Sequence, residues 1–187
     1  LRAPTPHPDV VVPGPGTGTH LTDFDGGFTV DGAPGVTAAV GVGPEGRSGL
    51  HLHFDKYELD GAQWPSIRIE AANIAPAGLP DAGWLGQTVW NPQAAESEIG
   101  VTLRDSRGKP WWARYYPLPA RRTTTLWSPL AEAARVCDLG DLSLVTLLMR
   151  RPASATDLVV MSLSLAPPRY TRAANARCAA ARDWTTA

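Results

Sequence analysis

The sequence predicts an all-β fold, an antiparallel β-sandwich of the jelly-roll type with one short helix. Nine or so short apolar segments recur at intervals of roughly 8 to 20 residues. Gly and Pro, with 18 residues each, lie between these segments, as in proteins made of many short strands joined by turns. Several segments alternate between apolar and polar residues, which is typical of strands with one buried face.

The length and the charge of the chain narrow its class. With 187 residues the chain can form one sandwich core, so we expect one domain with tails rather than two domains. Its 17 basic and 18 acidic residues leave a net charge of -1, which does not favour nucleic-acid or anionic-membrane binding. No apolar stretch approaches the roughly 18 residues of a membrane helix. We therefore expect no nucleic-acid and no membrane partner.

Composition divides the chain into three parts. Residues 1–20 are rich in Pro, Gly and Thr and are expected to form a linker or a strap over the domain. Residues 21–168 carry the strand patterns and form the predicted sandwich. Residues 169–187 contain good helix formers but too little apolar surface to fold alone, so they are expected to be a tail with helical propensity.

The predicted elements follow in order through the central part. One short helix is expected at residues 129–135, across an end of the sandwich. The expected strands are residues 21–28, 36–42, 50–57, 64–71, 85–90, 99–104, 111–116, 123–127, 142–150 and 158–165.

Residues 85–127 form the centre of the predicted sheet. The Asp105–Gly108 segment, Asp-Ser-Arg-Gly, predicts a hairpin because Asp and Ser bond to the local backbone and Gly takes the left-handed conformation. Five of the seven Trp residues lie between Trp84 and Trp127. Aromatic side chains on strand ends and loops indicate a surface for stacking the flat apolar faces of sugars.

Several short pieces of the sequence are similar to one family of folds. The pieces are residues 21–25 (LTDFD), 83–92 (GWLGQTVWNP), 99–108 (IGVTLRDSRG), 125–132 (TLWSPLAE) and a final pair within 142–165. Together they resemble the galactose-binding-like jelly rolls used as carbohydrate-binding modules, over about residues 21–166. The resemblance implies noncatalytic binding of a polysaccharide or oligosaccharide, often as part of a larger polysaccharide-active enzyme.

The resemblance also bears on metal binding. Modules of this kind often hold a structural calcium between an acidic residue of the first strand and an Asp of the last. Asp25 matches the first position, but Met161 stands at the second. Because a thioether does not replace an oxygen ligand of calcium, we expect no such site and no cofactor.

The polar faces of two strands supply candidate ligand contacts. His51 and His53 share one face of residues 50–57 with Asp55, and a metal site there would need a third ligand such as Glu70. A solvated polar face is the alternative. If Arg, Gln and Thr side chains of neighbouring strands continue the row, it offers hydrogen bonds to sugar hydroxyls. The candidate binding residues are His51, His53, Arg68, Glu70, Trp84, Gln87, Arg104, Trp112 and Arg114, with Trp84 and Trp112 as the aromatic platforms.

Two other functions remain open. A secreted jelly-roll polysaccharide lyase or glycoside hydrolase would use groups such as Glu70, His53, Arg68 and Tyr115. A structural or protein-interaction sandwich would instead have ordinary core aromatics and no cleft.

The cysteines and the first residue indicate the compartment. Cys137 and Cys178 fit one disulfide of an oxidising compartment, with two buried free thiols as the alternative. The chain begins at Leu1 rather than at a methionine, as a mature secreted protein or a cut fragment does. We therefore expect a secreted protein with a bridge between the tail and the domain.

Overall fold

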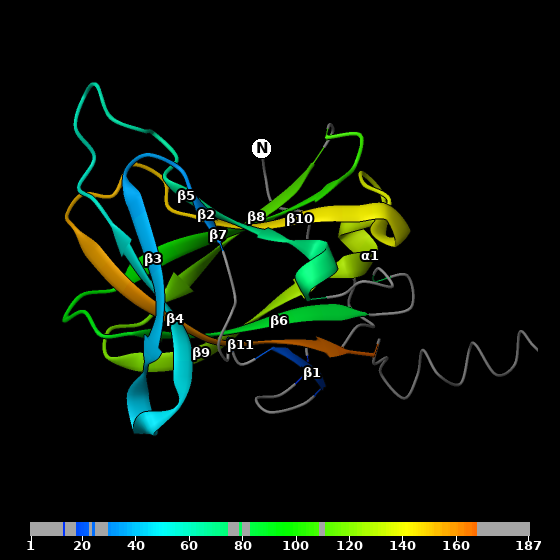
Figure 1. Ribbon diagram of the computed structural model, residues 1–187, viewed down its shortest axis with the longest axis horizontal. Coiled ribbons are helices and arrows are strands. Elements are labelled where there is room, and N and C mark those ends of the chain that lie inside the picture. The colour runs from blue at the N-terminus through cyan, green and yellow to red at the C-terminus, as the bar shows by residue number, and fades with distance from the viewer. Residues whose placement is uncertain are drawn as a thin grey trace, which may run out of the picture.

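The computed structural model describes residues 13, 18–22, 24, 30–74, 79, 83–108 and 111–167. Figure 1 shows strands in two layers, with a short helix, labelled α1, at one end. The strands are β1 (Thr19–Thr22), β2 (Asp31–Gly32), β3 (Val36–Val42), β4 (Ser48–Phe54), β5 (Ser66–Glu70), β6 (Trp84–Asn91), β7 (Ser97–Asp105), β8 (Trp112–Leu118), β9 (Arg122–Pro129), β10 (Leu142–Leu148) and β11 (Thr156–Ala166). The helix α1 is Leu130–Ala133, and three 3-10 turns are Pro44–Gly46, Ala71–Asn73 and Leu139–Asp141.

The strands form two antiparallel sheets. The six-stranded sheet has the order β3-β4-β11-β6-β9, and β1 pairs with the far end of β11. The five-stranded sheet has the order β2-β5-β10-β7-β8. Strands distant in sequence are neighbours in both sheets, because β4 pairs with β11 and β5 pairs with β10. The predicted all-β jelly-roll sandwich is confirmed.

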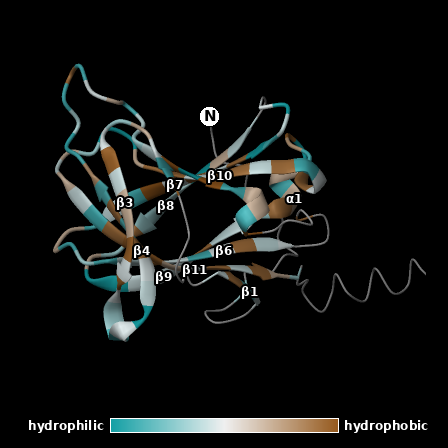
Figure 2. Ribbon diagram, in the orientation of Figure 1, coloured by the Kyte–Doolittle hydropathy of each residue, from teal (hydrophilic) through white to brown (hydrophobic). Residues whose placement is uncertain are grey.

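The core lies between the two sheets and follows the alternation of the strands. In β4, Leu50, Leu52 and Phe54 are fully or almost fully buried. In β5, Ile67 and Ile69 are completely buried between exposed or half-buried neighbours. Figure 2 shows the same alternation of hydrophobic and more polar residues along the strands. Burial of these apolar side chains, at about 25 cal/mol per Å², is the main force that holds the sheets together.

The predicted hairpin at Asp105 is confirmed and has a specific anchor. The Asp105 carbonyl accepts a hydrogen bond from Gly108 N at 3.0 Å, and Gly108 takes a φ of 79°. The buried Asp105 carboxylate accepts hydrogen bonds from the Arg107 side chain, from Arg107 N at 3.1 Å and from Asp138 N at 2.9 Å. These bonds lower the pKa of Asp105 from 3.8 to about 2, the Arg107 side chain contributing most. The carboxylate therefore ties the hairpin to the segment after α1.

Other boundaries differ from the predicted ones. The helix is shorter than residues 129–135, because α1 ends at Ala133 and continues only as turns. The two-residue strand β2 was not predicted. Both tails, residues 1–17 apart from Pro13 and residues 168–187, lie outside the described part, so the predicted strap and helical tail are not described. Within the described residues, no helix is long and apolar enough to cross a membrane.

Candidate functional site

The outer face of the five-stranded sheet carries polar and aromatic side chains in rows that cross the strands. Arg68 on β5 pairs with Thr146 on β10, which pairs in turn with Thr102 on β7. Because residues two apart in a strand share a face, the next row lies beside this one. Its members, in the same strand order and ending on β8, are Ser66, Leu148, Gly100 and Tyr115.

These rows form the floor of a groove of about 280 Å³. Three aromatic residues along the groove are exposed: Trp64 by 47 %, Trp111 by 46 % and Tyr115 by 37 %. Large aromatic side chains are usually buried, so three exposed rings along one groove indicate a binding surface. The lining residues are Trp64, Ser66, Arg68, Thr102, Arg104, Trp111, Ala113, Tyr115, Leu144, Thr146 and Leu148.

The rings of this aromatic groove are held by neighbouring side chains. The centroids of Trp64 and Tyr115 lie 6.5 Å apart, with their planes tilted by 46°. The guanidinium carbon of Arg150 lies 5.5 Å from the centroid of the Trp64 ring, and that of Arg104 lies 5.5 Å from the centroid of the Trp111 ring. Such contacts between a cation and a ring are worth about 0.5 to 1 kcal/mol at exposed sites, which favours defined ring positions.

Tyr115 fits beside a strand position that has no side chain. A Cβ added to Gly100 would lie 2.8 Å from Cε1 of Tyr115 and 2.8 Å from Cδ1 of Leu148. The Tyr115 ring therefore occupies the space that the glycine leaves. Partial burial raises the pKa of the Tyr115 hydroxyl, which accordingly keeps its proton and can donate a hydrogen bond at neutral pH.

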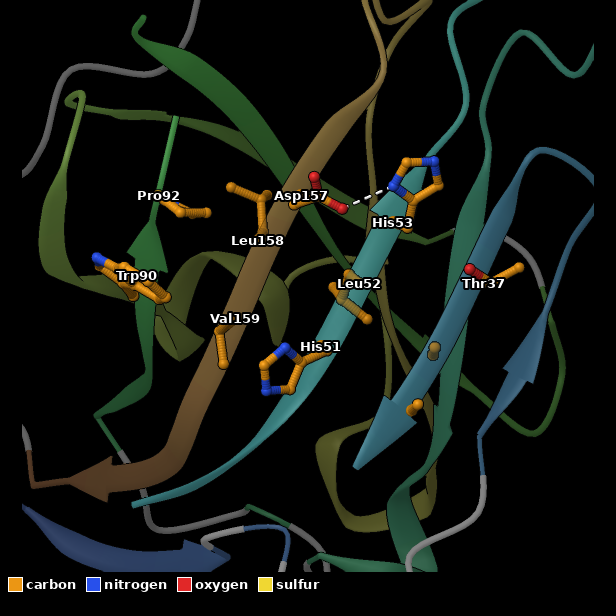
Figure 3. Close-up of a pocket in the computed structure, with 11 residues that line it drawn as sticks. Thr37, His51, Leu52, His53, Trp90, Pro92, Asp157, Leu158 and Val159 are labelled. Atoms are coloured by element: carbon orange, nitrogen blue, oxygen red, sulfur yellow. Dashed lines mark hydrogen bonds and ion pairs between the residues drawn. The ribbon is translucent and has the colours of Figure 1, made fainter. Parts of the chain in front are cut away.

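A second pocket, of about 290 Å³, lies on the outer face of the six-stranded sheet. Figure 3 shows His51 and His53 on β4, Asp157 and Val159 on β11 and Trp90 on β6 around it. Cross-strand pairing explains the grouping, because Asp157 pairs with His53, and Val159 pairs with both His51 and Trp90. We call this hollow the histidine pocket.

The three titratable side chains of the histidine pocket, His51, His53 and Asp157, already have partners within the protein. His53 Nδ1 lies 2.6 Å from Asp157 Oδ1, as the dashed line in Figure 3 marks, and Gln93 Nε2 lies 3.5 Å from the other oxygen of that carboxylate. His51 Nε2 lies 3.1 Å from the Val42 carbonyl oxygen. Among the described residues, no three His, Cys, Asp or Glu side chains are grouped so that they could hold a metal ion.

Three of the candidate binding residues point into the molecule rather than along the outer row. Gln87 is completely buried, and so are Leu85 and Val89, which lie two positions before and two positions after it on the same face of β6. Trp112 is 8 % exposed, and on β8 it shares the inner face with Arg114. The predicted platform at Trp112 and the predicted ligand contacts of Gln87 and Arg114 therefore do not fit the geometry of the sheets.

Gln87, which is buried, and Arg114, whose side chain is 30 % exposed, belong to one polar cluster on the inner side of the sheets. The Tyr116 hydroxyl donates to Ser128 Oγ at 2.9 Å, and Ser128 Oγ lies 3.5 Å from Gln87 Oε1. Burial raises the pKa of Tyr116 to about 12, so it keeps its proton. Arg114 Nη1 lies 3.5 Å from the Glu132 carboxylate on the short helix. The cluster links β6, β8, β9 and α1, which is a structural role.

The other predicted platform, Trp84, lies on the outer side of the six-stranded sheet but is only 6 % exposed. It forms a small apolar cluster with Trp127 and Ala166. Trp84 is therefore a packing residue in this structure. The remaining candidate binding residues are divided between the two sheets. Arg68 and Arg104 line the aromatic groove, and Glu70 is exposed two residues beyond Arg68. His51 and His53 lie in the histidine pocket.

The four candidate catalytic residues do not converge. Arg68 and Tyr115 line the aromatic groove, and Glu70 lies on the same strand as Arg68. His53 lies on the outer face of the opposite sheet. The core of the sandwich separates the two faces, so His53 cannot act with Tyr115 on one bond.

The predicted bridge between Cys137 and Cys178 is not present. Cys137 is a free thiol, 3 % exposed, and its Sγ lies 3.3 Å from the Ala133 carbonyl oxygen. Burial raises the pKa of this thiol. Cys178 lies outside the described residues. The alternative of a buried free thiol holds for Cys137.

The candidates did not include the two exposed Trp residues of the groove, Trp64 and Trp111, its hydroxyl residues Ser66, Thr102 and Thr146, or Arg150 at its rim. The sequence could have indicated that Trp111 faces outward. Trp112 lies an even number of positions from the buried Leu118 and so shares its inner face, and adjacent residues of a strand face opposite sides. Trp64 lies just before β5, next to Pro65, where the alternation of a strand does not predict which way a side chain points. Arg150 follows β10 and reaches the groove only through the pairing of that strand with β5.

Comparison of sequences and structures locates the chain among known folds. No protein-family model matches the chain, and no curated protein matches its sequence. Solved structures do match, and among them is the family 11 carbohydrate-binding module from Clostridium thermocellum in complex with a beta-1,3-1,4-mixed-linked tetrasaccharide. The two share 13 % identity over 80 % of this chain and 95 % of that chain, with a TM-score of 0.61.

Two further structures extend the comparison. The CBM22-1 xylan-binding domain from Paenibacillus barcinonensis Xyn10C matches 80 % of this chain and 96 % of its own, at 15 % identity and a TM-score of 0.53. An exo-beta-agarase matches 80 % of this chain but only 25 % of its own, at 10 % identity and a TM-score of 0.59. The chain therefore has the jelly-roll fold of carbohydrate-binding modules, which also occurs as one part of larger glycoside hydrolases.

Proposed function

We propose that this protein binds a polysaccharide, without cleaving it, in the aromatic groove of the five-stranded sheet. The observation that carries the proposal is the presence of three exposed aromatic rings, Trp64, Trp111 and Tyr115, along one groove. Aromatic faces provide apolar stacking surfaces at low cost in conformational entropy, and they dominate many binding interfaces.

The groove also contains the polar groups that a sugar chain requires. Hydroxyl groups of Ser66, Thr102 and Thr146 and the side chains of Arg68 and Arg104 lie among the rings. A hydroxyl can both donate and accept a hydrogen bond, and a guanidinium offers several donors. This mixture of stacking surfaces and hydrogen-bonding groups suits the apolar faces and hydroxyl edges of a sugar. The similarity in fold to a module solved with a tetrasaccharide supports the same function.

The geometry favours binding over catalysis. The groove is lined by no carboxylate, whereas glycoside hydrolysis generally uses two carboxylates at about 5 to 9.5 Å. A lyase needs a base, but Tyr115 has a raised pKa and His53 lies on the other sheet. A purely structural sandwich would leave the three exposed rings and the groove without a role.

We further propose that the protein is secreted and acts beside a catalytic domain. The matched exo-beta-agarase supports this arrangement, because the jelly roll is about a quarter of that chain. A polysaccharide that lies outside a cell is too large to enter it intact, so a module that binds such a polymer acts outside.

Affinity electrophoresis in gels that contain soluble polysaccharides would test the proposed function. We expect at least one polysaccharide to retard the protein, and Trp64→Ala to reduce the affinity by about 1 to 3 kcal/mol if the ring is central to the contact. Trp90→Ala, on the opposite sheet, is the matched control and should bind normally. The melting temperatures of both variants establish that they are folded.

Two results would contradict the proposal. One is an unchanged affinity of Trp64→Ala together with lost binding in Trp90→Ala, which would move the site to the histidine pocket. The other is the release of oligosaccharides from a retained polysaccharide by the purified protein, which would make it an enzyme.

A further inference from the structure

The charge of the aromatic groove is unlike that of the chain as a whole. Arg68 and Arg104 line the groove, and Arg150 lies against the Trp64 ring at its rim. The lining contains no Asp or Glu, although the whole chain has one more acidic than basic residue. The lining is thus positive on a molecule that is almost neutral, and one exposed acid, Glu70, stands beside it in the row of Leu144 and Arg104.

None of these three cations, Arg68, Arg104 and Arg150, is paired with an acid in the described part of the structure. The two contacts that Arg104 and Arg150 make are with aromatic rings. Asp31 is the strand partner of Arg68, yet the two side chains form no ion pair. Elsewhere in the same sandwich, Arg107 and Arg114 do pair with Asp105 and Glu132. The groove therefore has guanidinium groups available for an external anion.

The absence of carboxylates also weakens the case for a neutral sugar. A hydroxyl of a neutral sugar donates its proton to an acceptor, and a carboxylate is the strongest acceptor among side chains. The groove offers only hydroxyl oxygens as side-chain acceptors, while its guanidinium groups are donors only. An anionic ligand needs many hydrogen-bond donors and few acceptors in its site, and the lining of this groove has that composition.

We infer that the ligand of the aromatic groove is an acidic polysaccharide, whose carboxylate or sulfate groups meet Arg68 and Arg104 while its sugar rings stack on the aromatic side chains. This inference rests on the proposed function. The strand β10 separates β5 from β7, and Arg104 lies two residues out of register with Arg68, because Arg68 pairs with Thr146 and Arg104 pairs with Leu144. The two Arg backbones are therefore about 12 Å apart, which suits a polymer that repeats its charge. A planar guanidinium binds either anion with two parallel hydrogen bonds.

The test compares pairs of polymers that differ in charge but share a backbone type. Polygalacturonate and its methyl ester test a carboxylate, and carrageenan and agarose test a sulfate ester. We expect tighter binding to the charged member of at least one pair, and the pair that responds identifies the anion. Added salt should weaken this binding, because ions screen exposed charges.

Variants separate charge from stacking. Arg68→Gln and Arg104→Gln should each weaken binding to the charged polymer about two- to five-fold, the range for exposed ion pairs, without affecting a neutral one. Arg135→Gln, an exposed residue after α1 and away from the groove, is the matched control. If both polymers of each pair bind with equal affinity, and neither groove variant changes that affinity, the inference of an acidic ligand is wrong. The proposed binding of a polysaccharide is then still supported. If neither charged nor neutral polymers bind, the proposed function itself fails.

Discussion

Trp64 and Tyr115 come from distant parts of the chain, yet their ring centroids lie 6.5 Å apart on the outer face of the five-stranded sheet. Trp64 precedes β5 and Tyr115 lies on β8, and β10 and β7 lie between these two strands in the sheet. The rings meet because Tyr115 leans over Gly100, its strand partner, which has no side chain. The aromatic groove therefore depends on a glycine, because a side chain at this position would meet the Tyr115 ring.

Replacing this glycine should disturb the groove. In Gly100→Ala the new Cβ would lie 2.8 Å from the Tyr115 ring and from Leu148, so both side chains must move. We expect a loss of about 1 to 3 kcal/mol in the free energy of unfolding, as for other overpacked sites, and weaker polysaccharide binding. Urea denaturation and affinity electrophoresis would measure the two effects.

A double-mutant cycle checks the cause. If the Tyr115 ring is the obstacle, Gly100→Ala should cost less stability in a Tyr115→Ala background than in the natural protein. Equal costs in the two backgrounds would show that the ring does not occupy the space beside Gly100.

The Asp105 anchor should appear in the acid stability of the protein. Its pKa falls from 3.8 to about 2 on folding, so the ionised carboxylate stabilises the folded state above pH 3.8, and this contribution is lost as the pH falls toward 2. In Asp105→Asn the free energy of unfolding should be lower at pH 5 and should fall less steeply between pH 3.8 and 2 than in the natural protein.

Asp60→Asn provides the control for this pH dependence, because Asp60 is exposed in the loop before β5. It should retain the natural slope. An unchanged slope in Asp105→Asn, measured by chemical denaturation across this pH range, would show that Asp105 is not the group that titrates.

Local patterns in the sequence predicted the strands and the hairpin well, because alternation and turn chemistry act over a few residues. They could not tell which strands share a sheet. Residues 50–57 and 64–71 have the same pattern, but β4 joins the six-stranded sheet and β5 the five-stranded one, through partners far along the chain. The single polar row expected from His53 to Arg68 is therefore divided between two opposite faces.

Polar residues on the inner faces of the sheets were the second source of error. Gln87 and Arg114 have the strand parity of apolar neighbours such as Val89 and Trp112, so alternation alone would have turned them inward. Their polarity suggested the opposite. On the inner faces they meet elements that come together only in the folded chain, since Ser128 Oγ lies 3.5 Å from Gln87 Oε1 and the Glu132 carboxylate lies 3.5 Å from Arg114 Nη1.

The thiol of Cys137 should be protected in the folded protein. Its burial and raised pKa both reduce the amount of accessible thiolate, which is the form that reacts with iodoacetamide. We expect mass spectrometry to find the Cys137 peptide unmodified after brief treatment of the folded protein and modified after treatment in denaturant. Modification without denaturant, or a peptide joined to another through Cys137 before reduction, would contradict the free buried thiol.

The histidine pocket gives a prediction of small effect. His53 and Asp157 are paired, but their side chains are 44 % and 60 % exposed, and exposed ion pairs contribute about 0 to 1 kcal/mol. Asp157→Asn should therefore change the free energy of unfolding by no more than this and leave polysaccharide binding unchanged. A loss of binding at normal stability would show that the ligand occupies this face instead.

The location of the ligand is tested most directly by the indole N–H signals of the seven Trp residues in a ¹H–¹⁵N correlation spectrum, each assigned by substitution. Titration with a polysaccharide fragment that binds should shift the signals of Trp64 and Trp111, which line the aromatic groove, and leave that of Trp90 in place. A shift of Trp90 with Trp64 and Trp111 unaffected would contradict the account, because the ligand would then bind to the opposite sheet.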